Sequence, residues 1–313
     1  VPDPASVGQH LFDAASEMRR RGFSVRVITS ARGYDDPSRR YPRRETMGGV
    51  EVVRLGLASF GKSSLAARVL GSVLFSVQAI ATGLRTRDVT HLLVSTSPPL
   101  AGLIALVIAK LRHVRLVYWV MDLNPDQAVA LGVIKETSLI ARCLNWVNRR
   151  VLARADAVVV MDRYMEQRVL KKAPVASKLV VLPPWAHDVV TAPVAHVENP
   201  FRMQYIEDGA RAIMYSGNHT TTNPLTTLLE ATRAFNQARG LRFLFVGGGA
   251  AKAEVDHYVG PIVVSLPYQP LADLKWSLSA ADVHVVTMGE NMVGMIHPCK
   301  IYRALAVGRP ILF

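Results

Sequence analysis

Residues 243–249 read Phe-Leu-Phe-Val-Gly-Gly-Gly, and a stretch of helical character follows at residues 250–257. The apolar run predicts a buried strand, and the glycines after it predict a tight turn into the helix. A strand, a glycine turn and a helix in this order form a typical nucleotide-contact geometry, because backbone N–H groups at the turn face the phosphates. The dinucleotide fingerprint is incomplete, since Lys252 stands where its third glycine would be.

A second glycine-containing turn precedes this one in the sequence. Residues 215–219 read Tyr-Ser-Gly-Asn-His and follow a predicted strand at residues 212–215. Ligands of open α/β sheets bind at the carboxyl ends of the strands. We therefore expect the two turns to clasp one nucleotide diphosphate.

Short apolar runs alternate with helical stretches along the whole chain. Strands are predicted at residues 24–29, 91–95, 115–120, 157–161, 180–182, 212–215, 242–246, 262–266 and 283–287. Helices are predicted at residues 8–21, 139–153, 225–237 and 271–280, among others. This alternation predicts parallel sheets covered by helices on both faces, and the fold class is α/β.

The chain of 313 residues suits two domains of about 150 residues each. A proline-containing stretch from Pro183 to Pro200 interrupts the alternation and predicts a boundary. We expect an N-terminal domain at residues 1–190 and a C-terminal domain at residues 191–313, with a cleft between them. The chain begins without Met and ends in a strand-like run, so we expect it to be truncated at both termini.

The charge is distributed unevenly. The chain carries 37 Lys and Arg against 24 Asp and Glu, a net charge of +13, and residues 1–190 hold 27 of the basic and 15 of the acidic residues. A basic N-terminal half predicts an anionic partner such as phospholipid headgroups, a phosphate-bearing acceptor or nucleic acid. Aromatic residues make up only 7% and no nucleic-acid-binding module is recognisable, which argues against nucleic acid. The two cysteines have neither disulfide-framework nor zinc-site spacing, which favours a reducing, cytosolic compartment.

Residues 63–84 allow two interpretations. Residues 69–84 contain no charged side chain, but the run is shorter than the ~20 apolar residues that a membrane-spanning helix needs. A buried helix and a helix lying on a membrane surface both fit. Basic residues on either side favour the membrane surface: Lys62, Arg68, Arg85, Arg87 and the arginine-rich loop at 39–44.

Three further positions are candidates for chemistry. Gly8 lies at the start of a predicted helix, where amides attract anions. Lys300 falls in the first turn of a helix that Pro298 begins and Gly308 ends, so it can pair with an anion there. Asp122 follows the predicted strand at 115–120 and is a candidate for substrate contact or proton transfer.

Each of these features also has a purely structural interpretation. Gly8 fits a plain helix cap, the glycine run a tight turn, His219 a loop histidine, Lys300 a surface lysine and Asn124-Pro125 an N-cap. The spacing Asp122-x-Asn124-x-Asp126 lacks the later Gly and Glu of a calcium loop, so no metal site is predicted.

Taken together, these stretches resemble family 4 glycosyltransferases, which have the GT-B fold and retain anomeric configuration. The resemblance is to the branch that makes capsule, O-antigen or exopolysaccharide sugars, of the colanic-acid and L-fucosamine-transferase type. The matching stretches run in order along nearly the whole chain: PDPASVGQHL, MDLNPDQAVALGV, VLPPWAHD, NPFR, YSGNH, NPLTTLLEA, FLFVGGG, LPYQPLADL, SLSAADVHVV and HPCKIYRALAVGRPILF.

The resemblance implies two Rossmann-like domains and a nucleotide-sugar donor, UDP-linked, bound by the C-terminal domain. The donor-binding residues it implies are Gly8, Gly217, Asn218, His219, Gly247, Gly248, Gly249, Gln269 and Lys300. Asp122 and Glu290 are the expected catalytic residues. No metal or cofactor is expected, because cationic groups and amides stabilise the leaving diphosphate.

The implied acceptor is a polyprenyl-diphosphate-linked sugar, which matches the basic N-terminal half and places the protein peripherally on the cytoplasmic face of an anionic membrane. Two positions depart from the family pattern: Met121 stands at a usual His, and Arg303 near a usual Glu. A sugar-nucleotide epimerase of the same architecture and a non-catalytic nucleotide-sugar-binding relative remain alternatives.

Overall fold

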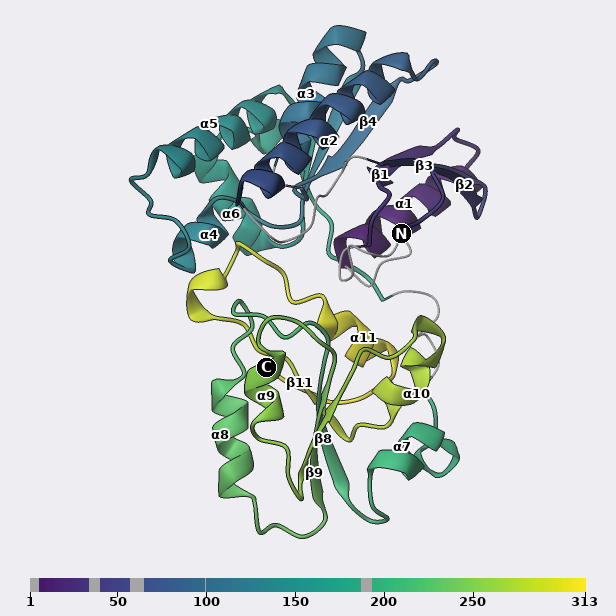
Figure 1. Ribbon diagram of the computed structural model, residues 1–313, viewed down its shortest axis with the longest axis vertical. Coiled ribbons are helices and arrows are strands. Elements are labelled where there is room, and N and C mark those ends of the chain that lie inside the picture. Colours follow the sequence, from purple (N-terminus) through teal and green to yellow (C-terminus); the bar gives the residue numbers. More distant parts are fainter. Residues whose placement is uncertain (1–5, 34–39, 57–64, 99, 187–192) are drawn as a thin grey trace. The chain divides into compact units, whose positions relative to one another are not determined.

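A computed structural model describes residues 6–33, 40–56, 65–98, 100–186 and 193–313. The chain divides into two compact units, Val1–Pro183 and Pro184–Phe313 (Figure 1). The expected boundary after residue 190, the first five residues, Arg39 and Lys62 lie outside the described residues. We call the two parts unit 1 and unit 2 and treat each separately.

The described residues of unit 1 form two sheets. In the smaller one, β1 (Arg26–Ser30) pairs in parallel with β3 (Val50–Leu55), and β2 (Arg44–Met47) pairs antiparallel with β3. Gly48 and Gly49, both with positive φ, make the turn between β2 and β3. The larger sheet is fully parallel, in the order β4 (His91–Ser95), β5 (Arg115–Val120), β6 (Ala157–Val160) and β7 (Leu179–Val181).

Helices connect these strands. In chain order they are α1 (Ser6–Arg20), α2 (Leu65–Arg85), α3 (Ala101–Arg112), α4 (Asp126–Ala130), α5 (Leu139–Arg154) and α6 (Arg163–Lys172), with a 3-10 turn η1 (Ala176–Lys178). Leu55, Ala79, Ile104 and Ile108 form a buried cluster, so one core joins β3, α2 and α3. Helices α3 and α5 contact each other and β5, and α6 contacts β6 and β7.

Helix α2 is half-buried, and the interpretation of residues 63–84 as a membrane-surface helix remains a prediction. On its inner side, a Cβ on Gly83 would lie 2.7 Å from Ile108 Cδ1, so the absence of a side chain lets α2 approach α3 closely. On its outer side, Val73 and Val77 are exposed. Among the described residues, none of the helices has the length and hydropathy needed to cross a membrane.

Unit 2 is built on one parallel sheet in the order β10, β9, β8, β11, β12. The strands are β8 (Arg211–Ser216), β9 (Leu241–Val246), β10 (Val263–Leu266), β11 (Val283–Val285) and β12 (Ile311–Leu312). From β8 the chain adds β9 and β10 on one side of the sheet and then β11 and β12 on the other. The carboxyl ends of β8 and β11 therefore flank the topological switch point, where α/β sheets bind ligands.

Short helices cover this sheet. They are α7 (Pro200–Tyr205), α8 (Thr226–Ala234), α9 (Lys252–Asp256), α10 (Leu274–Ser279) and α11 (Lys300–Ala306), with 3-10 turns η3 (His196–Glu198), η4 (Leu271–Asp273) and η5 (Glu290–Met292). Its core has two parts, one around Met214 and Leu244 and one around Tyr215 and Phe245, on the two sides of β8 and β9.

The predicted strands are confirmed to within two residues at each end, but three bounds differ for local reasons. The helix predicted at 225–237 ends at Ala234, and the Phe235 ring lies 6.4 Å from that of Phe243. The helix predicted at 271–280 opens as a 3-10 turn after Pro270. The strand predicted at 283–287 ends at Val285, and beyond it the Thr287 carbonyl accepts from Asn223 Nδ2 at 2.6 Å. Asn124 does not cap α4, whose N-cap residue is Pro125.

Asp282 joins the sheet of unit 2 to α7. Its carboxylate accepts hydrogen bonds from the Ala212 N–H of β8 at 2.8 Å and from Arg202 of α7 at 3.0 Å, and it pairs with Arg211 at 3.2 Å. Arg202 also donates to the carbonyl of Ala280 at 2.6 Å. Burial alone would raise the pKa of Asp282, but the hydrogen bonds from Ala212 and Arg202 outweigh it and hold the pKa below its usual range.

We expect Asp282→Asn to lower the free energy of unfolding at pH 7 by about 2 kcal/mol, because two charge-assisted contacts lose their anion. Because the pKa of Asp282 is lower in the folded state, its carboxylate stabilises the fold fully at pH values above its unfolded-state pKa of about 4. This stabilisation is lost as the pH falls through the folded-state pKa. The difference from wild type should therefore shrink below pH ~4. Urea unfolding measures this, and exposed Asp273→Asn is the control; equal effects of the two variants would contradict it.

Candidate functional site

The two glycine turns of unit 2 interlock at the carboxyl ends of β8 and β9. Gly217 N–H donates to the Val246 carbonyl at 2.8 Å, and His219 N–H donates to the Gly248 carbonyl at 2.7 Å. A Cβ on Gly247 would lie 2.0 Å from the Gly217 carbonyl oxygen. Since no side chain fits there, the sequence must have glycine at this contact, and the structure brings both predicted turns together.

The same steric constraint applies at Gly249, two residues further along the glycine run. A Cβ on Gly249 would lie 2.1 Å from Asn218 Oδ1 and 2.5 Å from the His219 carbonyl oxygen. Gly217, Gly247 and Gly249 also have φ values of 138°, 140° and 127°, which L-residues rarely adopt. Steric fit and backbone conformation therefore both demand glycine.

The loop after β10 completes this edge. Gly247 N–H donates to the Leu266 carbonyl at 2.9 Å, and the Tyr268 hydroxyl donates to the Gly248 carbonyl at 3.2 Å. Gln269 is half-buried, and its Nε2 donates to the Pro267 carbonyl at 3.0 Å. The loop after β10 therefore lies against the glycine run, and the amide of Gln269 hydrogen-bonds within its own loop.

Lys300 places a cation on the first glycine turn. Its Nζ donates to the Tyr215 hydroxyl at 2.5 Å and lies 4.5 Å from the centre of the Tyr215 ring. A Cβ on Gly217 would lie 2.6 Å from Lys300 Cε, so the lysine side chain runs directly over that turn. Burial lowers the pKa of Lys300 to about 8. Within the described part of the chain, its ammonium contacts no carboxylate, so an anionic ligand would be its natural counter-charge.

His219 braces the turns from within. The side chain is fully buried, and its Nδ1 lies 3.2 Å from the Gly248 carbonyl, which places the ring proton on Nδ1. Burial lowers the pKa of His219 to about 4, so the ring is neutral at pH 7. The imidazole is covered, and the predicted donor-binding role of His219 remains a prediction.

Two residues of this site were not expected from the sequence. The Tyr215 hydroxyl donates to the Asn218 carbonyl at 2.9 Å and accepts from Lys300, so it ties the lysine to the turn. Lys252 Nζ donates to the Leu266 carbonyl at 2.9 Å, which closes the end of β10. Lys252 could have been noticed in the sequence, because it replaces the third glycine of the dinucleotide fingerprint. No local sequence pattern distinguishes Tyr215.

Glu290 lies on the loop after β11, at the exposed start of η5. Gly289 N–H donates to the Thr222 carbonyl at 3.0 Å, which fastens this loop to the one that follows the first glycine turn. Glu290 therefore sits on the carboxyl side of the same sheet as Gly217. Its catalytic role remains a prediction.

Asp122 occupies the corresponding edge of unit 1, directly after β5. Its N–H donates to the buried Thr96 Oγ1 at 3.0 Å, which fixes the strand end. Burial raises the pKa of Asp122 to about 6, because the half-buried carboxylate has lost part of its hydration. Such a shift is typical of functional sites. Met121 beside it is buried, so the position that usually holds a His points into the core.

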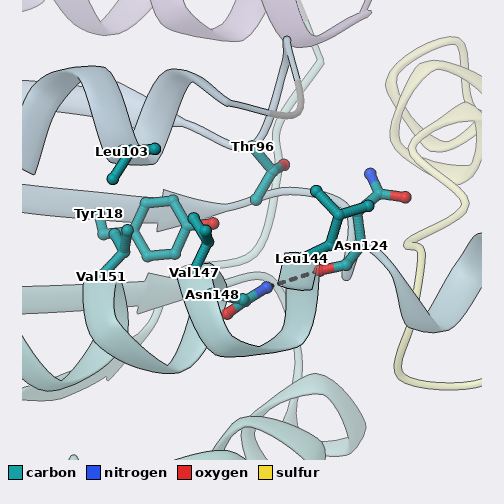
Figure 2. A pocket seen from close by; sticks show the side chains of 9 residues that line it. Thr96, Leu103, Tyr118, Asn124, Leu144, Val147, Asn148 and Val151 are labelled. Atoms are coloured by element: carbon teal, nitrogen blue, oxygen red, sulfur yellow. Dashed lines mark hydrogen bonds between the residues drawn. The ribbon is translucent and has the colours of Figure 1, made fainter. Parts of the chain in front are cut away.

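A small pocket lies next to this strand end, between α3, β5 and α5 (Figure 2). Its volume of about 20 Å³ holds roughly one water molecule and is too small for a sugar. Asn148 Nδ2 donates to the Asn124 carbonyl at 2.6 Å across it and holds the loop that carries Asp122 (Figure 2). The residues around this pocket hold the loop in place, and the pocket itself is not a substrate site.

Gly8 lies in the first turn of α1 in unit 1. A Cβ built on it would meet no atom within 4 Å, so packing does not require glycine there. Its predicted approach to a phosphate remains a prediction. Among the described residues, no group of three or more His, Cys, Asp or Glu is placed to hold a metal ion.

The parallel sheets define an α/β protein, and the glycine turns of unit 2 lie at the carboxyl ends of its strands, where α/β sheets bind ligands. Residues 7–185 match the family described as "Glycosyl transferase 4-like domain". The chain therefore belongs to this glycosyltransferase family, and the resemblance inferred from the sequence is confirmed.

Two curated relatives support this assignment. The probable glycosyltransferase WbjE of Pseudomonas aeruginosa is 30% identical over 253 residues, which cover 79% of this chain and 62% of that protein. The putative colanic acid biosynthesis glycosyl transferase WcaI of Escherichia coli K12 is 24% identical over 324 residues, covering 98% of this chain and 79% of that protein. The chain thus spans less than two thirds of WbjE.

The fold has solved counterparts. The structure of Anabaena Alr3699/HepE in complex with UDP and glucose superposes with a TM-score of 0.70 at 14% identity, covering 99% of this chain and 77% of that one. At this identity the likeness establishes the fold alone. The expected GT-B class, with two Rossmann-like units, is confirmed.

We expect Gly247→Ala to destabilise unit 2 far more than Gly240→Ala. Gly240, with φ 74°, is near the left-handed region that costs alanine about 1 kcal/mol, whereas Gly247, with φ 140°, lies outside that region and its new Cβ would also meet a backbone oxygen. The clash should add about 2 kcal/mol or more to the loss of unfolding free energy. Urea unfolding of the two variants measures the difference, and similar losses would show that the turns do not interlock.

Proposed function

We propose that this protein transfers a sugar from a UDP-linked donor to a polyprenyl-diphosphate-linked sugar, with retention of anomeric configuration, in cell-surface polysaccharide synthesis. The observation that carries the proposal is the Lys300 ammonium held over the Gly217 turn without a carboxylate partner in the described structure. A site with exposed backbone, a nearby cation and no acid in contact fits a diphosphate.

The donor assignment draws on two supports. The first is the position of the Gly217 turn, which follows β8, one of the two strands that flank the switch point where α/β sheets bind ligands. The second is HepE, a protein of this fold whose solved structure is a complex with UDP and glucose. In this assignment the turns and Lys300 hold the diphosphate, and the loop carrying Tyr268 and Gln269 lies by the nucleoside.

The chemistry follows from where charge develops. When the bond from the sugar to the diphosphate breaks, negative charge grows on the departing phosphate oxygen, and a cation fixed beforehand stabilises that charge without reorganising. The Tyr215 hydroxyl keeps Lys300 over the turn, so its rotamer is set before the donor binds. We assign the stabilisation of the leaving group to Lys300, with no metal or cofactor, because the N–H groups of Gly217, His219 and Gly247 already donate to backbone carbonyls.

The acceptor is assigned to unit 1. Residues 1–190 carry most of the excess positive charge, which suits a diphosphate-linked acceptor at the cytoplasmic face of an anionic membrane. Asp122, whose pKa is raised to about 6, is ionised at pH 7 and suited to bind the acceptor hydroxyl and take its proton.

Lys300→Ala should weaken UDP binding by roughly 5- to 150-fold, the equivalent of about 1–3 kcal/mol for a hydrogen bond to a charged group. Wild-type affinity should also fall as the pH rises through about 8, because the ammonium is lost above its pKa. The variant should lack that pH dependence. Calorimetric titration with UDP measures both, with Lys275→Ala as the control, and unchanged affinity in the Lys300 variant would remove this lysine from the site.

Asp122→Asn should reduce kcat by on the order of a hundredfold, as expected for loss of a general base. Since the carboxylate is the active species, wild-type kcat should decline as the pH falls below about 6, and the variant should show no such decline. UDP release in the presence of lipid-linked acceptor measures both profiles. A variant with wild-type kcat across this pH range would refute the assignment.

A further inference from the structure

The outward side of helix α5 in unit 1 carries large apolar residues in water. Leu139 is 80% exposed, Ile140 62% and Trp146 55%, and Val133, on the turn before the helix, is 71% exposed. Leu139, Cys143, Trp146 and Arg150 follow the i, i+4, i+7, i+11 spacing of one helical stripe. Large apolar side chains gathered on one exposed face mark an interaction surface.

The inward side of the same helix is fully occupied by packing. Val147 and Val151 point into the small pocket beside Tyr118 of β5, and Asn148 is fastened to the Asn124 carbonyl (Figure 2). The Ser138 side chain caps the helix by accepting from Ala141 N–H at 3.2 Å. Helix α5 is therefore held in place by unit 1, and its outward face is presented as a preformed surface.

This outward face is basic as well as apolar. The sequence of α5 contains four arginines and no acidic residue, and all four are exposed: Arg142, Arg149, Arg150 and Arg154. The Arg150 guanidinium lies 5.2 Å from the centre of the Trp146 ring. The Trp146 ring and the Arg150 guanidinium therefore place an apolar surface and a positive charge side by side on this face.

We infer that the outward face of α5, with Leu139, Ile140, Trp146 and its arginines, is the surface by which this protein docks on an anionic phospholipid bilayer. Trp prefers the boundary between acyl chains and headgroups, and helices with apolar and Arg residues on one side lie in that boundary. The absence of any acid on α5 complements a negative surface.

The inference deepens the proposed function and rests on it only in naming a membrane-bound acceptor. An acidic protein would also attract the arginines, but an interface with a protein would need hydrogen-bonding side chains around a small group of apolar residues. Here, Leu139 and Ile140 project at the helix end nearest Val133, Arg142 lies in the first turn, and the other three arginines lie toward the other end. That order suits shallow insertion of one end among lipid headgroups.

The test is co-sedimentation of the full chain with vesicles of phosphatidylcholine alone or mixed with phosphatidylglycerol. Wild type should bind the mixed vesicles and bind phosphatidylcholine weakly. Replacing Arg142, Arg149 and Arg150 together by Gln should weaken binding on the order of a hundredfold. Trp146→Ala should weaken it at unchanged charge, and the control Lys110→Gln, Arg115→Gln, Lys171→Gln removes equal charge from other exposed sites of unit 1.

Equal loss in the control and α5 triple variants would show that bulk charge binds the vesicles and would overturn the assignment. So would a Trp146→Ala variant that binds as wild type does, or a wild type that binds poly-glutamate but not the vesicles. UDP titration of the same variants separates this inference from the proposed function: it should be unaffected, and a wild type that binds vesicles without binding UDP would contradict only the proposed function.

Discussion

The close approach of the Gly217 carbonyl to Gly247 is the constraint on which the rest of unit 2 depends. Because β8 and β9 are parallel neighbours in register, their ends reach the same edge together, and the turns that follow must pass through the same space. Only glycine leaves room for that. The contact in turn fixes the path of Asn218 and His219 and the surface over which Lys300 lies.

The electrostatics of the site follow from this packing. The buried, neutral His219 fills the space beneath the turns and adds no charge, whereas Lys300 brings a partly desolvated ammonium above them. The phenol of Tyr215 is its hydrogen-bond partner, and a neutral phenol does not cancel the charge. A cation held in this way is attracted to a diphosphate more strongly than one already paired with a carboxylate.

Both units use the carboxyl ends of parallel strands, but with different chemistry. In unit 2 these ends carry glycine turns and a lysine, and in unit 1 the end of β5 carries a carboxylate whose pKa is raised by burial. Around that carboxylate, Thr96 and Asn148 hold the loop by hydrogen bonds to its backbone. These two hydrogen bonds thus run to the backbone of the loop and not to the Asp122 carboxylate.

The sequence by itself determined the type and order of most strands, the glycine turns and the basic character of the first half, because these follow from local apolar runs, from φ preferences and from composition. It missed β2 and β3, whose short pattern of charged and apolar residues is not distinctive. Only the tertiary structure decided that Tyr215 reaches Lys300, that His219 is covered, and that α5 turns apolar side chains outward. The physical reason is that such partners lie on different strands and helices, and the face that an element buries is set by its neighbours in space.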